Sequence, residues 1–146
     1  MTRILIAVAL IAGCFASLDS AHAATTKEDY ELLERCGKRA EELFKREWGS
    51  GISKTGETTT MGSYTNHYNK KLNKCFYLET STALTPKGKN KGTSEQMGLY
   101  DINENKEYGQ FFKNDSDKLP FVCNVQGAEC RSKQEWDSLI RPFMNE

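Results

Sequence analysis

The chain has 146 residues and a balanced charge, with 20 lysine and arginine residues against 20 aspartate and glutamate residues. This balance argues against nucleic acid as a partner, because nucleic-acid-binding surfaces carry an excess of basic side chains. Hydrophobic residues make up only 38% of the chain, and an export leader inflates even that share. The remainder has the length of one domain with a small hydrophobic core, and exported proteins with small cores are commonly stabilised by disulfides.

Residues 1–23 have the pattern of an export signal. Arg3 supplies a positive charge, residues 4–12 form an apolar run, and Ala21-His22-Ala23 offers small residues at the two positions that a signal peptidase reads. The apolar run is far shorter than the roughly 20 residues of a membrane-spanning helix. We therefore expect cleavage after Ala23, a periplasmic or extracellular location, and no transmembrane helix.

A second processing site lies within the same leader. Ile11-Ala12-Gly13-Cys14 looks like a bacterial lipobox, in which the cysteine is acylated and becomes the first residue. On that alternative the protein is an envelope lipoprotein tethered through Cys14, and a membrane is its partner only through the lipid. The well-placed Ala-His-Ala site favours cleavage after Ala23.

Four cysteines remain after the leader, namely Cys36, Cys75, Cys123 and Cys130. An even number in an exported chain indicates two disulfides, for which three connectivities exist. We predict Cys36–Cys75 and Cys123–Cys130, with crossed pairings or free thiols as alternatives. The first pair would close a loop of about 40 residues, which the chain-entropy model values at roughly 4 kcal/mol.

The segment before residue 49 predicts an amphipathic helix. Thr25 and Glu28 have the spacing of a capping box, and Gly49-Ser50-Gly51 ends the helix. Apolar residues recur at steps of three and four between these ends. This apolar face consists of Leu33, Cys36, Ala40, Leu43, Phe44 and Trp48. We expect Cys36 to reach from it to the sheet.

The middle of the chain predicts a hairpin. Residues 49–60 are rich in glycine, serine and threonine and indicate a loop, whereas 61–68 indicate a strand that carries Tyr64 and Tyr68 on one face. A helix is the alternative for 61–68, because Tyr64, Tyr68 and Leu72 also fit a four-residue step. Residues 74–82 follow as a strand with apolar side chains on both faces, which indicates a central position in the sheet.

The last third predicts more strands and a final helix. We expect a loop over 85–95, a hairpin over 96–103 and 107–113, and a strand over 119–122 that lies at an edge because Pro120 has no amide donor. Ser132 to Glu135 is a second capping box, and the following helix should kink or end near Arg141 because of Pro142. The prediction is a single α+β domain over residues 24–146, with an N-terminal helix, a four- or five-stranded antiparallel sheet, a short C-terminal helix and two disulfides.

His67 is the only histidine beyond the leader. A cysteine–histidine enzyme would pair it with a free thiolate, for which Cys75 is the nearest cysteine in sequence. Oxidation of Cys75 in an exported protein would remove that nucleophile. We therefore lean against an enzyme and keep Cys75 with His67 as the enzymatic alternative.

Metal sites find little support in the sequence. One histidine and paired cysteines cannot make the usual zinc set. Oxygen-bearing side chains alternate as at the start of a calcium loop at Asp101, Asn103, Asn105 and Glu107. However, Lys106 stands where that loop needs glycine, and Phe112 stands where it needs a bidentate glutamate. We expect neither a metal nor another cofactor.

Lysines outnumber carboxylates between residues 66 and 98. Together with the neighbouring aromatic residues they offer an interaction surface, which consists of His67, Tyr68, Lys70, Lys71 and Lys74. An acidic partner would suit such a surface, although lysines in loops are more often simply solvated.

The motif His67-Tyr68-Asn69-x-x-Leu72-x-Lys74-Cys75-Phe76, followed by Cys123, Cys130-x-Ser132 and a short amphipathic helix, resembles small exported bacterial proteins that are uncharacterised. The resemblance implies a secreted or periplasmic setting and carries no activity. On these grounds we expect a non-enzymatic binding or interaction module, similar in kind to an inhibitor or an immunity protein. Its partner would be another protein or a small ligand.

Overall fold

A computed structural model describes residues 26–88 and 91–145. The predicted leader, with Cys14 and the cleavage site after Ala23, lies outside these residues. Within the described ranges, no helix is both long enough and apolar enough to cross a membrane.

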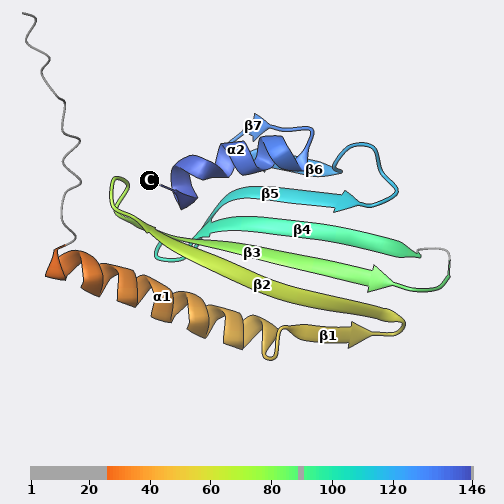
Figure 1. The fold of residues 1–146 in the computed structure, drawn as a ribbon, viewed down its shortest axis with the longest axis horizontal. Coiled ribbons are helices and arrows are strands. Elements are labelled where there is room, and N and C mark those ends of the chain that lie inside the picture. Colours follow the sequence, from red (N-terminus) through yellow and green to blue (C-terminus); the bar gives the residue numbers. More distant parts are fainter. Residues whose placement is uncertain (1–25, 89–90, 146) are drawn as a thin grey trace, which may run out of the picture.

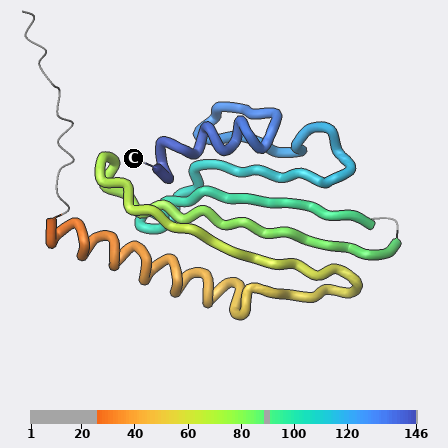
Figure 2. The backbone as a smooth tube through the Cα atoms, in the orientation of Figure 1, coloured from red at the N-terminus to blue at the C-terminus, as the bar shows by residue number. Residues whose placement is uncertain are grey.

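The protein is an α+β meander, as predicted. Helix α1 (Lys27–Trp48) precedes the sheet and helix α2 (Lys133–Met144) follows it. Between them lie β1 (Ile52–Thr55), β2 (Thr58–Asn69), β3 (Lys74–Thr85), β4 (Gly92–Asp101), β5 (Lys106–Asn114), β6 (Val122–Val125) and β7 (Ala128–Glu129). Each strand pairs antiparallel with its sequence neighbours, so that the described sheet has seven strands in chain order (Figures 1 and 2).

The prediction of four or five strands was therefore too low. Strand β1 lies in the segment that its glycine, serine and threonine content indicated to be a loop. It pairs with the first residues of β2, through register pairs such as Ile52 with Met61, across a turn at Gly56 (φ 60°). Strand pairing satisfies backbone groups whatever the local composition is, and threonine is itself β-branched and suits a strand.

The predicted strand over 119–122 was misplaced. Strand β6 begins only at Val122, and Pro120 lies before it in irregular structure. The reason is the register: β6 pairs with β5 through Phe111 and Cys123, and a two-residue turn at Gln126-Gly127 (φ 50° and 84°) then starts β7. Phe121 is left 81% exposed.

Helix α1 begins one residue later than predicted. Thr26 is the N-cap, and its hydroxyl accepts from the Asp29 amide while the Asp29 carboxylate accepts from the Thr26 amide. The predicted apolar face holds for Cys36 and Ala40, which are buried, but Leu33 is exposed. Leu32 packs on the buried cluster instead.

Helix α2 has the predicted N-cap, because the Ser132 hydroxyl accepts from the Glu135 amide. However, the helix runs through Pro142 to Met144 and does not end near Arg141. The last turn has an outside partner: the Asn69 side-chain amide donates to the carbonyl oxygens of Pro142 (3.0 Å) and Phe143 (3.4 Å). Helix-end carbonyls satisfied in this way offset the hydrogen bond that proline removes.

The two helices pack on opposite faces of the sheet. Alternation along β3 directs Cys75 and Tyr77 to one face, against α1, and Phe76 to the other, against α2, as predicted. We call these the α1 face and the α2 face. The main core lies on the α2 face and consists of Phe76, Met97, Leu99, Tyr108, Phe111, Cys123, Val125, Cys130, Trp136 and Ile140.

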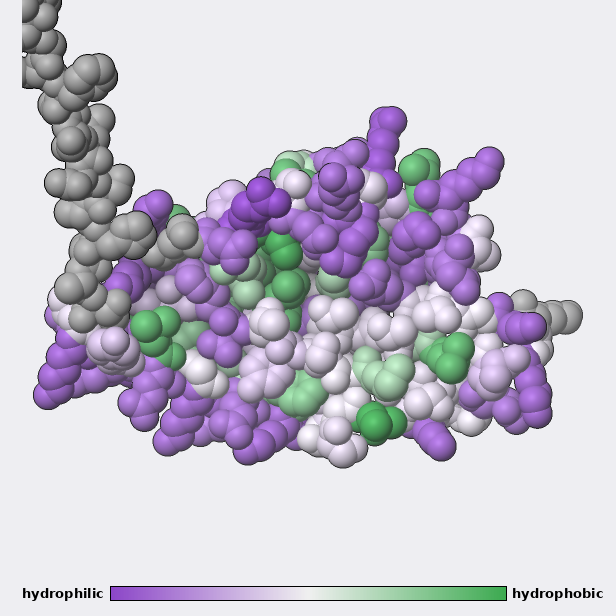
Figure 3. Space-filling model, viewed as in Figure 1, coloured by the Kyte–Doolittle hydropathy of each residue, from purple (hydrophilic) through white to green (hydrophobic). Residues whose placement is uncertain are grey.

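Both predicted disulfides are present. Cys36–Cys75 (Cα–Cα 5.5 Å) ties α1 to β3, and Cys123–Cys130 (Cα–Cα 5.0 Å) ties β6 to the segment before α2. In the space-filling view the helices are largely hydrophilic, whereas the exposed part of the sheet is pale with isolated hydrophobic side chains (Figure 3). The sheet is thus covered only in part by its two helices.

Candidate functional site

A groove with a volume of about 670 Å³ lies between α1 and the sheet. We call it the α1 groove. Its walls and floor are Arg39, Glu42, Leu43, Arg46, Glu47, Tyr77, Glu79, Tyr100, Asp101, Ile102 and Asn105. Volumes of this size are typical of sites for small molecules.

The helical wall of the groove is one stripe of α1. Its members Arg39, Glu42, Leu43, Arg46 and Glu47 recur at steps of three and four, which places them on one face of a helix. Eight residues of helix separate the first from the last, a rise of roughly 12 Å. The wall therefore has a basic end at Arg39 and an end at Glu47 that also holds Arg46.

The sheet side of the groove can be aligned with the two ends of the helical wall. Beside the Cys36–Cys75 disulfide, the Ile102 amide donates to the Cys75 carbonyl oxygen (3.0 Å). Glu79 lies four residues further along β3, roughly 13 Å away at strand spacing. Because α1 runs beside β3 from Cys36 toward Trp48, Ile102 lies at the Arg39 end and Glu79 lies at the Glu47 end.

The floor of the groove is aromatic. Tyr77 and Tyr100 are register partners on β3 and β4 and occupy the α1 face side by side. The Tyr100 ring lies over Gly98, where a Cβ atom would meet the ring at 2.5 Å. Glycine is thus required at position 98 for the ring to lie against the sheet.

Carboxylates surround the two tyrosine hydroxyls. Burial raises the pKa of Tyr77, and the negative charges of Glu79 and Glu47 raise it further. The pKa of Tyr100 is raised by burial and then by Glu107, Glu79 and Glu47. The Tyr77 hydroxyl donates to Glu79 over 3.5 Å. The floor consequently holds neutral phenols in a negative local field.

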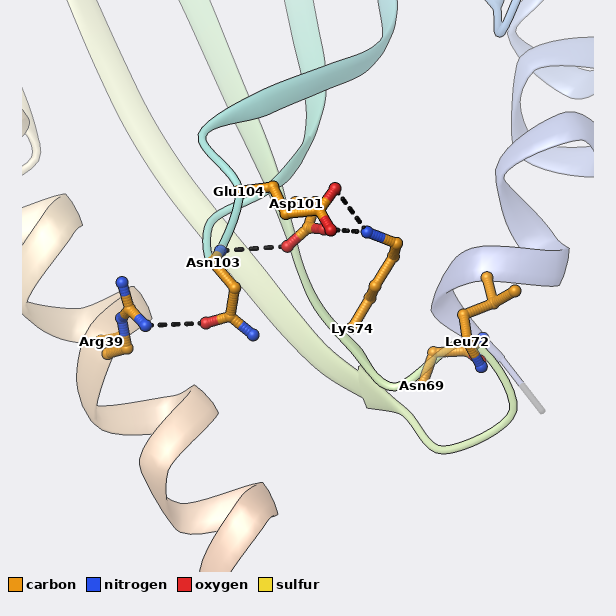
Figure 4. Close-up of polar contacts among 7 residues, drawn as sticks. All are labelled: Arg39, Asn69, Leu72, Lys74, Asp101, Asn103 and Glu104. Carbon is orange, nitrogen blue, oxygen red and sulfur yellow. Dashed lines mark hydrogen bonds and ion pairs between the residues drawn. The ribbon is translucent and has the colours of Figure 1, made fainter.

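An ion-pair network closes the basic end. Lys74 Nζ lies 2.7 Å from Asp101 Oδ2 and 2.6 Å from Glu104 Oε2 (Figure 4). Asp101 is fully buried, and its second oxygen accepts from the Asn103 amide (3.0 Å). The Asp101 carboxylate, and after it that of Glu104, raises the pKa of Lys74. The network pairs the Lys74 ammonium with two carboxylates and fixes the β4–β5 turn.

Arg39 joins this turn to α1. Its Nη1 donates to Asn103 Oδ1 (2.8 Å; Figure 4). Its Nη2 donates to the Ile102 carbonyl oxygen (3.5 Å), and both acceptors are neutral. Among the described residues, no carboxylate forms an ion pair with Arg39. Its guanidinium has five N–H donors, so donors remain for a ligand.

The structure separates the two residues of the enzymatic alternative. His67 is the register partner of Phe76 and therefore lies on the α2 face, whereas Cys75 lies on the α1 face within a disulfide. The sheet stands between them, and the Cys75 sulfur is bonded to Cys36. This geometry does not form a nucleophile–base pair.

The residues of the predicted interaction surface do not share one face. Tyr68 is buried on the α1 face and donates to Asn73 (2.6 Å). Lys70 pairs with Asp29 (2.9 Å), and Lys74 lies in the network with Asp101. Lys71 is exposed in the β2–β3 turn, and His67 is on the α2 face.

The α1 groove was missed from the sequence. Its lining comes from α1, β3, β4 and the β4–β5 turn, so no short motif contains it. The one local signal was Gly98-Leu99-Tyr100, a glycine two residues before a tyrosine on one strand face. Within the described residues, no group of three or more histidine, cysteine, aspartate or glutamate side chains is arranged to hold a metal ion.

Comparison of the chain with family models, with curated proteins and with solved structures gave no match.

Proposed function

We propose that this protein is an exported, non-enzymatic binding module whose ligand site is the α1 groove. The observation that carries the proposal is the groove itself, an open hollow with an aromatic floor between two walls of charged side chains. Ligand sites are typically such concave, partly apolar surfaces with a few polar groups that orient the ligand.

The rigidity of the walls supports a binding role. The Cys36–Cys75 disulfide fixes α1 to β3, and the bond from Arg39 to Asn103 fixes it to the β4–β5 turn. A preformed site loses little entropy when it binds a ligand. The export part of the proposal is supported by the apolar leader and by two disulfides, which persist in oxidising compartments.

The test combines mass spectrometry and ligand titration. Intact mass of the natively purified protein, alkylated with and without reduction, should show no free thiol and an N-terminus after Ala23. A rapidly alkylated Cys75 would support the enzymatic alternative, and a mass increment from acyl chains on Cys14 would support the lipoprotein.

Titration of the ¹⁵N-labelled, oxidised protein with a library of small molecules and short peptides then locates the site. Binding should shift amide signals near Arg39, Leu43 and Tyr100, and Tyr100→Ala should weaken the binding. The matched control is Phe121→Ala, which removes an exposed aromatic ring outside the groove. Ligands that shift only signals of the α2 face would contradict the proposal.

A further inference from the structure

We propose that the α1 groove binds a short peptide of about three residues with free termini, whose carboxylate lies at Arg39 and whose ammonium lies at Glu79. This inference rests on the proposed function and names its ligand class. It follows from the charges at the two ends of the groove, from the distance between them, and from the floor that separates them.

The Arg39 end suits an anion. The Arg39 guanidinium donates only to neutral oxygens, those of Asn103 and Ile102, and keeps donors for a carboxylate. Two carboxylates of the lining lie near this end: Asp101, which is already held by Lys74 and by the Asn103 amide, and Glu42, which lies one helical turn from Arg39 on α1 and forms no ion pair with it among the described residues. Arg39 therefore keeps N–H donors that no carboxylate of the described residues occupies.

The opposite end suits a cation. Glu79 accepts only the long 3.5 Å bond from the Tyr77 hydroxyl and forms no ion pair among the described residues. Glu47 is paired with Arg46 (3.2 Å), whereas Glu79 has no ion-pair partner among the described residues. The Tyr77 and Tyr100 rings beside it add the aromatic surface over which ammonium groups are favourable.

The span between the two ends fits a peptide. Measured from the Cys36–Cys75 bond, Arg39 lies three residues along α1, about 4.5 Å, and Glu79 lies four residues along β3, about 13 Å, so the two ends are roughly 9 Å apart along the groove. An extended peptide reaches at most about 3.3–3.6 Å for each residue, so about three residues join the two ends. A free amino acid is too short to contact both, and the groove volume of about 670 Å³ accommodates the longer ligand.

The experiment measures the affinity of tri-alanine and tetra-alanine by isothermal titration calorimetry. Each peptide is compared with its N-acetylated form and with its C-terminal amide. A charged hydrogen-bonding group that loses its partner should weaken binding by roughly tenfold or more. We expect each blocked form to bind at least about tenfold more weakly than the peptide with two free termini.

Two variants test which residue binds each terminus of the peptide. In Glu79→Gln, the affinity for the free peptide should fall to that of the wild type for the N-acetylated peptide, and acetylation should then have no further effect on the affinity. In Arg39→Gln, the affinity for the free peptide should fall to that of the wild type for the C-terminal amide, and amidation should then have no further effect. Asn103→Ala is the matched control, because it breaks the bond to Arg39 but keeps the guanidinium, and it should still discriminate against the amide.

Stability is monitored alongside, by thermal unfolding of each variant. If Arg39→Gln fails to fold, the Glu79→Gln arm decides the proposal alone, because Glu79 makes only one long contact. Glu57→Gln, in the exposed turn between β1 and β2, is the control for a general loss of negative charge.

The outcomes separate the two proposals. Blocked and free peptides of equal affinity, or discrimination that survives Glu79→Gln, would overturn the peptide assignment. If these peptides do not bind but other compounds do, in a manner sensitive to Tyr100→Ala, the peptide assignment fails and the binding function stands. If nothing binds in the groove, both fail.

Discussion

The two faces of the sheet share the same strands but hold their helices in different ways. On the α2 face, Trp136 is fully buried and Ile140 nearly so, in a core built with side chains from β3 to β6. On the α1 face, the helix buries only Cys36 and Ala40 and is tied by a disulfide. The first face is held by the main core, whereas the second is held by a disulfide, a smaller buried cluster and the contact of Phe44 with Tyr64, and the α1 groove stays open beside it.

This difference explains where a site can exist. A helix that is held by apolar packing must cover the surface on which it packs, because its stability comes from excluding water. A helix that is held by a disulfide and by polar bonds at its ends can leave a hollow beside it. The α1 groove lies in that hollow, and the predictions below test the contrast between the two faces.

The largest effect is expected on the α2 face. Trp136→Ala deletes a fully buried ring that packs against Phe111 (centroids 6.0 Å apart) and should cost about 3–5 kcal/mol of unfolding free energy. Urea denaturation monitored by circular dichroism measures it. Phe121→Ala removes an exposed ring of similar size and should change the stability by less than about 0.5 kcal/mol.

The Cys36–Cys75 disulfide should stabilise the protein more than Cys123–Cys130 does, because it closes the longer loop. Cys36 and Cys75 are 39 residues apart in sequence, and Cys123 and Cys130 are seven apart. The chain-entropy model gives about 4 kcal/mol for the first and about 2.5 kcal/mol for the second. Denaturation of the Cys36→Ala/Cys75→Ala and Cys123→Ala/Cys130→Ala proteins measures both.

The location of the damage sharpens the comparison. Without Cys36–Cys75, hydrogen exchange should accelerate in α1 while β4 and β5 stay protected, because the core on the α2 face is untouched. Uniform loss of protection throughout the sheet would show that both faces unfold as one unit. The proposed difference in how the helices are held would then be wrong.

A smaller effect is expected from glycine substitutions. A Cβ atom at Gly98 would lie 2.5 Å from the Tyr100 ring, so Gly98→Ala should displace the ring and cost about 1–3 kcal/mol. Gly37→Ala is the matched control in α1, where the nearest atom to the new Cβ, the Asn66 side-chain nitrogen, is 3.9 Å away. It should stabilise the protein by about 1 kcal/mol through helix propensity. Equal effects of the two substitutions would contradict this account of the groove floor.

The sequence predicted those parts of the fold that local chemistry determines. The Ser132 cap, the alternation of Cys75 and Phe76, and the Cys123–Cys130 pair each depend on spacing within a short segment. The Cys36–Cys75 pair spans 39 residues, and its prediction came from the place of Cys36 on the apolar face of the helix. Strand β1 could not be predicted in this way, because its hydrogen bonds come from β2 and not from its own composition. The same holds for the continuation of α2 through Pro142, which Asn69 supports from 73 residues away.

The candidate site was less predictable than the fold. His67 and Cys75 are close in sequence, but the register partner of Cys75 is Tyr68. Successive residues of a strand face opposite sides of the sheet, so His67 lies on the other face. Arg39 and Glu79 are 40 positions apart and define a site only once the Cys36–Cys75 bond lays α1 beside β3. Charged residues on an amphipathic helix ordinarily face water, so their pattern alone predicts no groove.

The smallest effect concerns the phenol in the groove floor. Tyr77→Phe keeps the ring that stacks on Tyr64 (5.3 Å) and removes only a hydroxyl with one long contact, so at pH 7 the stability should change by about 0.5 kcal/mol or less. Alkaline pH should reveal the difference. The folded state raises the pKa of Tyr77 above its unfolded value of about 10, so it retains a proton that the unfolded state loses. As the pH rises above about 10, ionisation of Tyr77 in the unfolded state therefore lowers the free energy of unfolding.

Urea denaturation between pH 8 and pH 11 measures this loss. The pKa of Tyr100 and that of Lys74 are also raised, and for both the sign is the same: the folded state binds more protons at high pH. The wild-type stability should therefore decline above about pH 10, and Tyr77→Phe should decline less steeply, with the remaining slope due to the other groups. An unchanged slope in Tyr77→Phe would mean that Tyr77 is accessible to hydroxide and water, and that the floor of the α1 groove is less enclosed than its packing against α1 implies.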